Sequence, residues 1–100
     1  MGETAPRQRA MITIASKPVM PPYIKMRHDA GRNRWLILAP ERLFDPDEIA
    51  VAILKLCDGQ RTVGDIAGVM AKEYNAPAAE IEADIIAMFQ DLADKGVVKA

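Results

Sequence analysis

The stretch from Trp35 to Gly59 constrains the fold of this chain more than any other part of the sequence. It joins an apolar run, a turn at Pro40 and Glu41, and two further apolar residues to the start of a helix. The turn and the helix start leave only residues 42–44 to form an extended segment. A strand this short belongs at the edge of a sheet, where the backbone of another chain can pair with it.

The helix that follows carries its own start and end signals. Asp45 can accept hydrogen bonds from free backbone N–H groups, Pro46 suits the first helical position, and Glu48 completes a capping box. We therefore expect a helix over residues 46–58, with Gly59 as its C-terminal cap. Apolar residues occupy well over half of the circumference of this helix, so other elements must cover it on two sides.

Two strands are predicted before the turn. Residues 23–28 alternate between apolar and polar, which places Ile24 and Met26 on a buried face. Residues 34–38 are apolar on both faces, so we expect them to form the central strand of an antiparallel sheet. Residues 42–44 then form the edge of that sheet.

Two further helices are predicted after Gly59. Thr62 and Asp65 have the spacing of a capping box and open the first of them. The second spans about residues 78–95 and carries an apolar arc of about 160°, which is wider than one packing contact usually needs. The sequence thus predicts a single α+β domain, in which a three-stranded antiparallel sheet is followed by three helices.

The start of the chain contributes little to this predicted core. Residues 1–20 contain prolines among polar and small residues, so we expect a disordered segment there and the folded domain over residues 21–100. The chain shows neither the apolar core of a signal peptide nor an unbroken apolar span of about 20 residues. We therefore expect a cytoplasmic protein that does not bind membranes.

The reactive side chains of the sequence argue against an enzyme. There is one histidine, His28, and one cysteine, Cys57. The chain therefore offers no second histidine for a catalytic triad or a metal site. We expect Cys57 to be a small buried side chain and His28 to lie on the hairpin surface. The sequence predicts no catalytic residue, no metal ligand and no cofactor.

Four spaced blocks of the sequence resemble one known family. The blocks agree with that family in order, and the resemblance covers roughly residues 18–98. They read L-I-L-A-P-E at 36–41, I-L-K-L-C-D-G at 53–59, R-T-V at 61–63 and D-I-I-A-M-F-Q-D-L at 84–92. On these blocks the chain resembles the PqqD family, pyrroloquinoline quinone biosynthesis protein D.

The resemblance implies a stand-alone precursor-peptide recognition element of winged helix-turn-helix form. Members of the family bind a small ribosomal precursor peptide and present it to a radical S-adenosylmethionine enzyme in the biosynthesis of pyrroloquinoline quinone. The domain itself does no chemistry. For this chain the resemblance therefore implies a peptide chaperone with two partners, the precursor peptide and the radical enzyme.

The alternative for such a fold is a winged-helix regulator that binds nucleic acid. Basic residues outnumber acidic ones up to Arg42, whereas the helical part that follows is acidic. The helix over 78–95 carries five acidic residues and a single lysine, Lys95. Because this helix would meet repulsion from phosphates, we expect no nucleic-acid binding. Its acidic surface can instead steer a basic partner.

The edge strand is where we expect the peptide to bind, as an additional strand. Each backbone hydrogen bond contributes about 0.5 to 1.5 kcal/mol, whereas ordering each peptide residue costs about 1 to 2 kcal/mol. Affinity must therefore come from peptide side chains in an apolar groove beside the strand. The candidate peptide-binding residues are Arg42, Leu43 and Phe44 on the edge strand, with Ile49, Ile53, Ile85, Met88 and Phe89 on the first and last helices.

Overall fold

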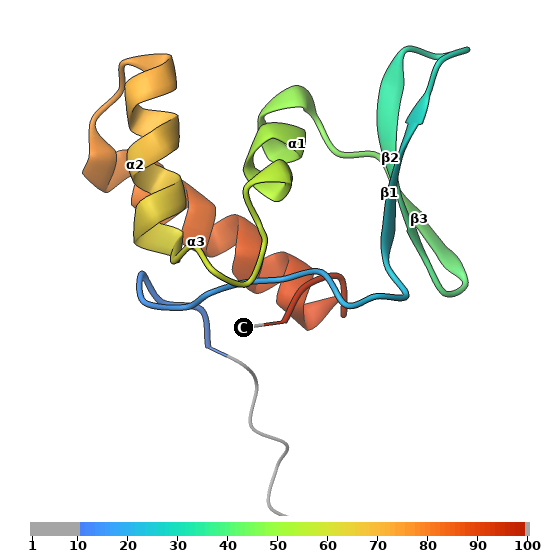
Figure 1. Ribbon diagram of the computed structural model, residues 1–100, viewed down its shortest axis with the longest axis horizontal. Coiled ribbons are helices and arrows are strands. Elements are labelled where there is room, and N and C mark those ends of the chain that lie inside the picture. The colour runs from blue at the N-terminus through green and yellow to red at the C-terminus, as the bar shows by residue number, and fades with distance from the viewer. Residues whose placement is uncertain (1–10, 100) are drawn as a thin grey trace, which may run out of the picture.

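The computed structural model describes residues 11–99. Its elements follow one another as three strands and then three helices (Figure 1). The strands form one antiparallel sheet in the order β1-β2-β3, so the predicted fold class, central strand and edge strand are confirmed. The elements are β1 (Lys25–Asp29), β2 (Arg34–Ala39), β3 (Arg42–Phe44), α1 (Glu48–Lys55), α2 (Val63–Tyr74) and α3 (Ala78–Asp94).

One face of the sheet packs on the helices. Figure 1 shows all three helices on the same side of the sheet. Ile37 at the centre of β2 is buried, and its partners Met26 in β1 and Phe44 in β3 pack against the core. Lys25 and Arg27 alternate with these residues and lie exposed on the opposite face, as the sequence predicts.

The core lies between this inner face and the helices. Its largest buried side chains include Ile37 from β2, Leu54 from α1, Ile66 from α2 and Phe89 from α3. These residues belong to a single cluster, so the sheet and every helix share one core. Among the helices of residues 11–99, none is long and apolar enough to cross a membrane.

The start of α1 differs from the prediction. The N-cap is Asp47, whose carboxylate accepts a hydrogen bond of 2.8 Å from the backbone N–H of Ala50. The expectation that Asp45 caps the helix is wrong, because its carboxylate forms an ion pair with Arg34 of β2 instead. Asp45 therefore ties the sheet to the segment that leads into the helix.

The end of α1 also differs, since the helix stops at Lys55 and not at residue 58. The N–H groups of Leu56 and Cys57 bond at 3.0 Å to carbonyl oxygens three residues earlier, which tightens the last turn. Gly59 has a φ of 77°, a left-handed conformation that glycine adopts without steric cost. Gly59 thus shapes the loop after the helix instead of capping it.

The two longer helices match the prediction closely. At the start of α2, the Thr62 hydroxyl accepts from the N–H of Asp65, and the Asp65 carboxylate accepts from the N–H of Thr62, both at 3.0 Å. The predicted capping box is therefore confirmed. α3 begins after Pro77, and Gly96 follows its end with a φ of 79°. The two valines after Gly96 return to the core and are buried.

The segment before β1 is part of the fold. Ile12 is only 5% exposed and belongs to the core cluster. Val19 pairs with Lys99, each backbone N–H donating to the carbonyl oxygen of the other at 2.9 Å. The expected disorder over residues 1–20 is therefore wrong for residues 11–20. The rest of that segment lies outside the described residues.

Candidate functional site

Within residues 11–99, the outer edge of β3 has no strand beside it. A two-residue turn at Pro40 and Glu41 joins β2 to β3, with Ala39 opposite Arg42 as the last pair. In such a hairpin the pair beside the turn is hydrogen-bonded, and hydrogen-bonded pairs then alternate with non-hydrogen-bonded pairs. The pair of Leu38 with Leu43 is therefore non-hydrogen-bonded. The N–H and C=O of Leu43 therefore point away from β2. They offer one donor and one acceptor to an incoming strand.

The opposite edge of the sheet is less suited to this role. β1 also pairs only with β2 among the described residues. It carries charged side chains at Lys25, Arg27 and Asp29, and such residues commonly protect an edge strand against pairing. β3 has two apolar residues and one charged residue, which favours β3 as the recognition edge.

A groove lies beside β3 on the inner face of the sheet, between β3, α1 and the second half of α3. Its volume is about 210 Å³. Cavities of roughly 150 Å³ accommodate a benzene ring, so a large apolar side chain fits here. The groove is lined by Ile37, Phe44, Asp45, Pro46, Ala50, Leu54, Met88, Asp91, Leu92 and Lys95.

The charged residues at this groove are paired with one another or with the sheet. The Lys95 ammonium nitrogen lies 2.8 Å from a carboxylate oxygen of Asp91. Asp45 forms its ion pair with Arg34. Each pair joins one positive and one negative group, so the groove combines an apolar floor with a rim that has no net charge. Such a site binds an apolar side chain without leaving a charge unpaired.

Four of the predicted peptide-binding residues lie at this groove or on its edge strand. The Arg42 guanidinium lies 4.9 Å from the centre of the Phe44 ring, close enough for a cation–π contact. Phe44 and Met88 both line the groove. Leu43 is 61% exposed, and its side chain lies on the outer face of the sheet. Leu43 therefore contributes its backbone, and not its side chain, to this candidate site.

The other four predicted residues lie elsewhere. Ile49, Ile53 and Ile85 line a separate cavity of about 200 Å³ between the helices. Phe89 is fully buried in the core. The structure therefore brings Phe44 and Met88 together beside β3, but it does not bring these four residues to the same groove.

Of the residues that line the groove, only Phe44 and Met88 were predicted from the sequence, and the other apolar residues on the helices were missed. On α1, Ala50 and Leu54 line the groove. Each follows a predicted residue by one position and therefore points about 100° further round the helix. On α3, Leu92 lines the groove one turn after Met88. The spacing of four residues was the signal that identifies Leu92, because such pairs lie on one helix face.

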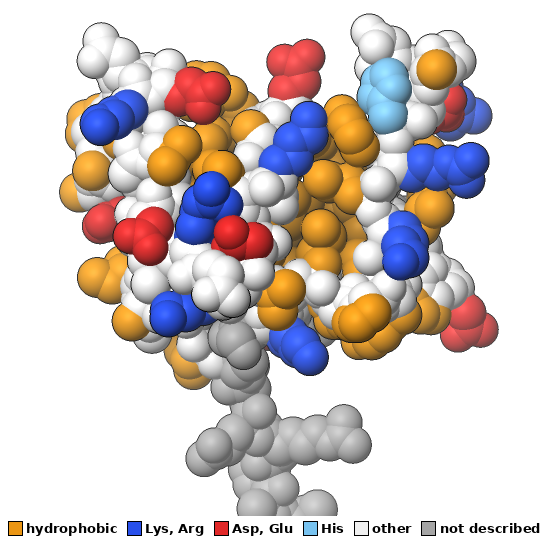
Figure 2. Space-filling model, in the orientation of Figure 1, with side chains coloured by type: hydrophobic (Ala, Val, Ile, Leu, Met, Phe, Trp, Pro, Cys, Tyr) orange, Lys and Arg blue, Asp and Glu red, His pale blue; other side chains and the backbone are white. Residues whose placement is uncertain are grey.

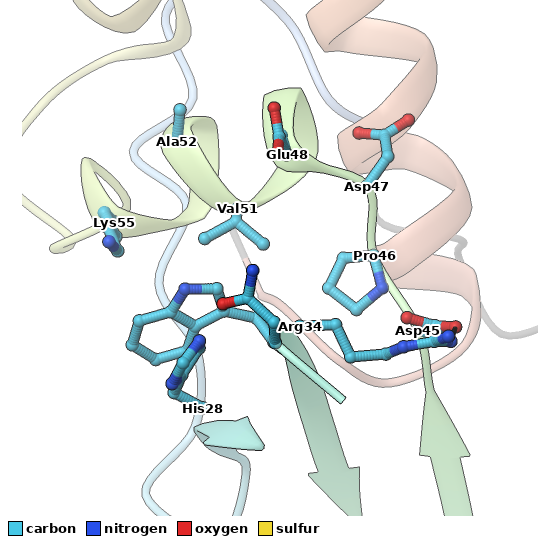
Figure 3. A pocket seen from close by; sticks show the side chains of 11 residues that line it. His28, Arg34, Asp45, Pro46, Asp47, Glu48, Val51, Ala52 and Lys55 are labelled. Carbon is cyan, nitrogen blue, oxygen red and sulfur yellow. Dashed lines mark hydrogen bonds and ion pairs between the residues drawn. The ribbon is translucent and has the colours of Figure 1, made fainter. Parts of the chain in front are cut away.

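A larger cavity of about 630 Å³ lies between α1 and the hairpin of β1 and β2 (Figure 3). The Trp35 ring in this cavity lies 5.2 Å from the His28 ring and 4.6 Å from the Lys55 ammonium nitrogen. Figure 2 shows an apolar hollow between the helices and the sheet. Asp45 and Pro46 line both this cavity and the groove, so the two adjoin. The sequence did not predict this extension of the surface.

Cys57 is buried and lines neither the groove nor the larger cavity. Burial, together with the neighbouring charge of Asp58, raises the pKa of the Cys57 thiol to about 12. The thiol therefore stays protonated at neutral pH, whereas nucleophilic and metal-binding cysteines act as thiolates. Cys57 is a small buried side chain, as expected from the sequence.

Comparison with known proteins shows which family this chain belongs to. The chain matches the family described as Coenzyme PQQ synthesis protein D (PqqD) over residues 34–98. It is 53% identical to the PqqA binding protein of Bradyrhizobium diazoefficiens over 85 residues, which cover 85% of this chain and 82% of that protein. It is 48% identical to part of the bifunctional coenzyme PQQ synthesis protein C/D of Methylorubrum extorquens, over 82% of this chain and 22% of that protein.

Two solved structures share the fold. The solution NMR structure of the PqqD truncation of Methylobacterium extorquens PqqCD has a TM-score of 0.78 and 44% identity, covering 89% of this chain and 95% of that chain. The crystal structure of PqqD from Xanthomonas campestris has a TM-score of 0.57 and 34% identity, covering 89% of this chain and 99% of that chain. The predicted winged-helix-like architecture is thereby confirmed. This chain belongs to the PqqD family.

Proposed function

We propose that this chain is a peptide chaperone of pyrroloquinoline quinone biosynthesis, which binds the ribosomal precursor peptide PqqA as a fourth strand on β3. One observation carries the proposal: the backbone N–H and C=O of Leu43 face an open edge directly beside an apolar groove. An extended peptide gains backbone hydrogen bonds from such an edge and specificity from pockets for its alternate side chains.

The relatives support this function. The protein from Bradyrhizobium diazoefficiens is named a PqqA binding protein. The Methylobacterium extorquens domain is described as a functional and stand-alone recognition element for ribosomally synthesised and post-translationally modified peptides. Both share most of this chain's length, so the peptide-binding role is assigned to the whole domain.

Strand alternation determines which peptide side chains enter the groove. The peptide residue paired with Leu43 carries its side chain on the outer face, as Leu43 does. Its two neighbours carry theirs on the inner face, beside Arg42 and Phe44. An apolar side chain beside Phe44 enters the groove, where its burial contributes about 1.5 to 3 kcal/mol.

This single anchor offsets the ordering of only one or two peptide residues, at about 1 to 2 kcal/mol each. Tight binding therefore needs a second anchor. The cavity beside Trp35 adjoins the groove at Pro46 and supplies one. Its Trp35 ring, with the Lys55 ammonium over it, offers an aromatic surface to an apolar side chain of the peptide. We place the two anchors in series along the bound peptide.

The bound peptide is then presented, in the cytoplasm, to the radical S-adenosylmethionine enzyme that modifies it. This chain contributes binding and orientation and no reacting group. The Cys57 thiol, which stays protonated at neutral pH, supports that division of roles. Holding the peptide extended on a rigid sheet reduces the ordering cost that the enzyme would otherwise meet.

An amide-resolved NMR titration of the full chain with the precursor peptide tests this function, with a scrambled peptide as the control. We expect shifts centred on Arg42 to Phe44 that extend to Met88 and Leu92, and none with the scrambled peptide. If a saturating concentration of the precursor peptide shifts no amide signal, the proposed function is wrong. Shifts centred on Lys25 to Asp29 would move the recognition edge from β3 to β1.

A further inference from the structure

The outer face of the sheet carries apolar side chains where polar ones are expected. In an antiparallel sheet with one covered face, the solvent-facing positions normally alternate to polar residues. Leu36 and Leu38 of β2 and Leu43 of β3 instead lie on the face opposite Ile37. Figure 1 shows the helices on the other side of the sheet, and no described element covers this face.

Basic side chains flank these leucines. Lys25 lies opposite Leu38 and Arg27 lies opposite Leu36 in the register of β1 and β2. Both are exposed, and neither forms a salt bridge with any residue in 11–99. The outer face is therefore apolar at its centre and positive at its rim.

The outer face is not flat. A shallow hollow of about 410 Å³ opens on it, next to the leucines of β2. Such a depression accepts a projecting side chain of a partner, which a flat sheet surface cannot do. The hollow is lined by Arg27, His28, Asp29, Ala30, Leu36 and Leu38.

This face continues onto the proposed peptide strand. Lys25, Leu38 and Leu43 are direct neighbours across the three strands. Cross-strand partners share a face, so the peptide residue paired with Leu43 becomes the fourth member of this row. Peptide binding thus enlarges the outer face by one outward side chain and covers the free backbone of β3.

We propose that this outer face, together with the outward side chain of the bound peptide, is the docking surface for the enzyme that modifies the peptide. The inference rests on the proposed function. The matching surface of the enzyme is apolar at its centre and rich in carboxylates at its rim, because it must cover the leucines and complement Lys25 and Arg27. The acidic α3 repels such a surface and so directs it to the sheet. Docking is tighter with peptide bound.

The test measures binding of the radical enzyme encoded with the precursor peptide, with and without that peptide, by calorimetry on the full chain. The variant Lys25→Glu/Arg27→Glu reverses two charges on β1, while the peptide strand lies beyond β3. The control Lys17→Glu/Lys72→Glu makes the same change in charge at exposed positions outside the sheet. We expect about tenfold weaker enzyme binding and a flatter salt dependence for the β1 variant only.

Peptide affinity, measured separately, should stay within about twofold in both double variants. A third variant, Leu36→Thr, tests the apolar centre without adding charge and should also weaken enzyme binding, with its fold checked by circular dichroism. Enzyme binding by the β1 variant as tight as by the control would overturn the inference. So would equal enzyme affinity with and without peptide. If the unaltered chain does not bind the peptide, the proposed function itself is wrong.

Discussion

Glu41 adopts a backbone conformation that few L-amino acids occupy. Its φ of 60° lies in the left-handed region, which costs a residue with a side chain about 1 to 2 kcal/mol. Glu41 is the second residue of the turn between β2 and β3, and this turn sets Ala39 opposite Arg42. This strained turn therefore helps to fix the strand register in which the backbone N–H and C=O of Leu43 point away from β2.

Replacing Glu41 with glycine should stabilise the fold. Glycine adopts positive φ freely and is the preferred second central residue of a type II turn that follows proline. We expect Glu41→Gly to raise the free energy of unfolding by up to about 1 kcal/mol in urea denaturation, after the entropy cost of glycine is subtracted. Glu41→Ala keeps the strain and should give no gain. Equal stability of the two variants would contradict a strained turn.

The backbone of Leu43 can be tested apart from its side chain. Leu43→Pro removes the N–H that faces the open edge but leaves the hydrogen bonds to β2 in place. We expect peptide affinity to fall by about tenfold or more, since one bond is lost and a peptide carbonyl is left unpaired. Fluorescence anisotropy with labelled peptide measures this loss. Thermal unfolding should confirm that the helices stay folded.

Leu43→Ala is the matched control, because it shortens the same side chain and keeps the donor. It should bind peptide more tightly than the proline variant. If the two variants bind equally, the peptide does not add to β3 as a strand.

At the scale of the elements, α2 depends on a charged cap. The backbone N–H of Thr62, and then its side chain, lower the pKa of the Asp65 carboxylate below its usual value of 3.8. The folded state therefore holds this carboxylate in its charged form more strongly than the unfolded state does. The stability it contributes is fully present above about pH 4 and is lost as pH falls through the lowered pKa.

Asp65→Asn should therefore lower stability at pH 7 and have a smaller effect at acid pH. Urea denaturation at pH 7 and at about pH 3 measures both values, with Glu73→Gln as a control at an exposed carboxylate later in the same helix. A stability difference that is the same at both pH values would show that the charge of Asp65 has no part in the cap.

The elements also show what sequence patterns can predict. The bounds of β3 were predicted because local signals, a proline turn before it and a proline after it, leave no alternative. The cap of α1 was misassigned because Asp45 bonds to Arg34, which lies in another element. The periodicity of α1 showed an apolar surface on two sides, but it could not show that Ile49 faces α2 while Ala50 faces β3.

At the scale of the whole molecule, the segment before β1 is held by distant partners. The backbone N–H of Ile12 donates to the side-chain oxygen of Gln90 at 3.0 Å, across 78 residues of sequence. No local pattern near Ile12 encodes this contact, and for that reason composition alone predicted disorder. The lining of the groove was only partly predicted for the same reason, because its walls come from β3, α1 and α3 together.

Ile12→Ala should destabilise the domain by about 2 kcal/mol or more, because it removes a buried side chain from a packed core. Ile14→Ala is the control, since Ile14 is 53% exposed and its loss should change stability by less than about 0.5 kcal/mol. Chemical denaturation of both variants measures the difference. Similar values for the two would show that the segment is not part of the stable core.

The pairing of Val19 with Lys99 has a consequence for the order of folding. The loop that this pairing closes contains every strand and helix of the domain. Closing so long a loop costs chain entropy before the contact is gained, so this clasp should form after the local hairpin and helices. During synthesis Lys99 is also made after all of these elements. The pairing of Val19 with Lys99 therefore completes the fold last, and it can form only after the ribosome has translated the last helix.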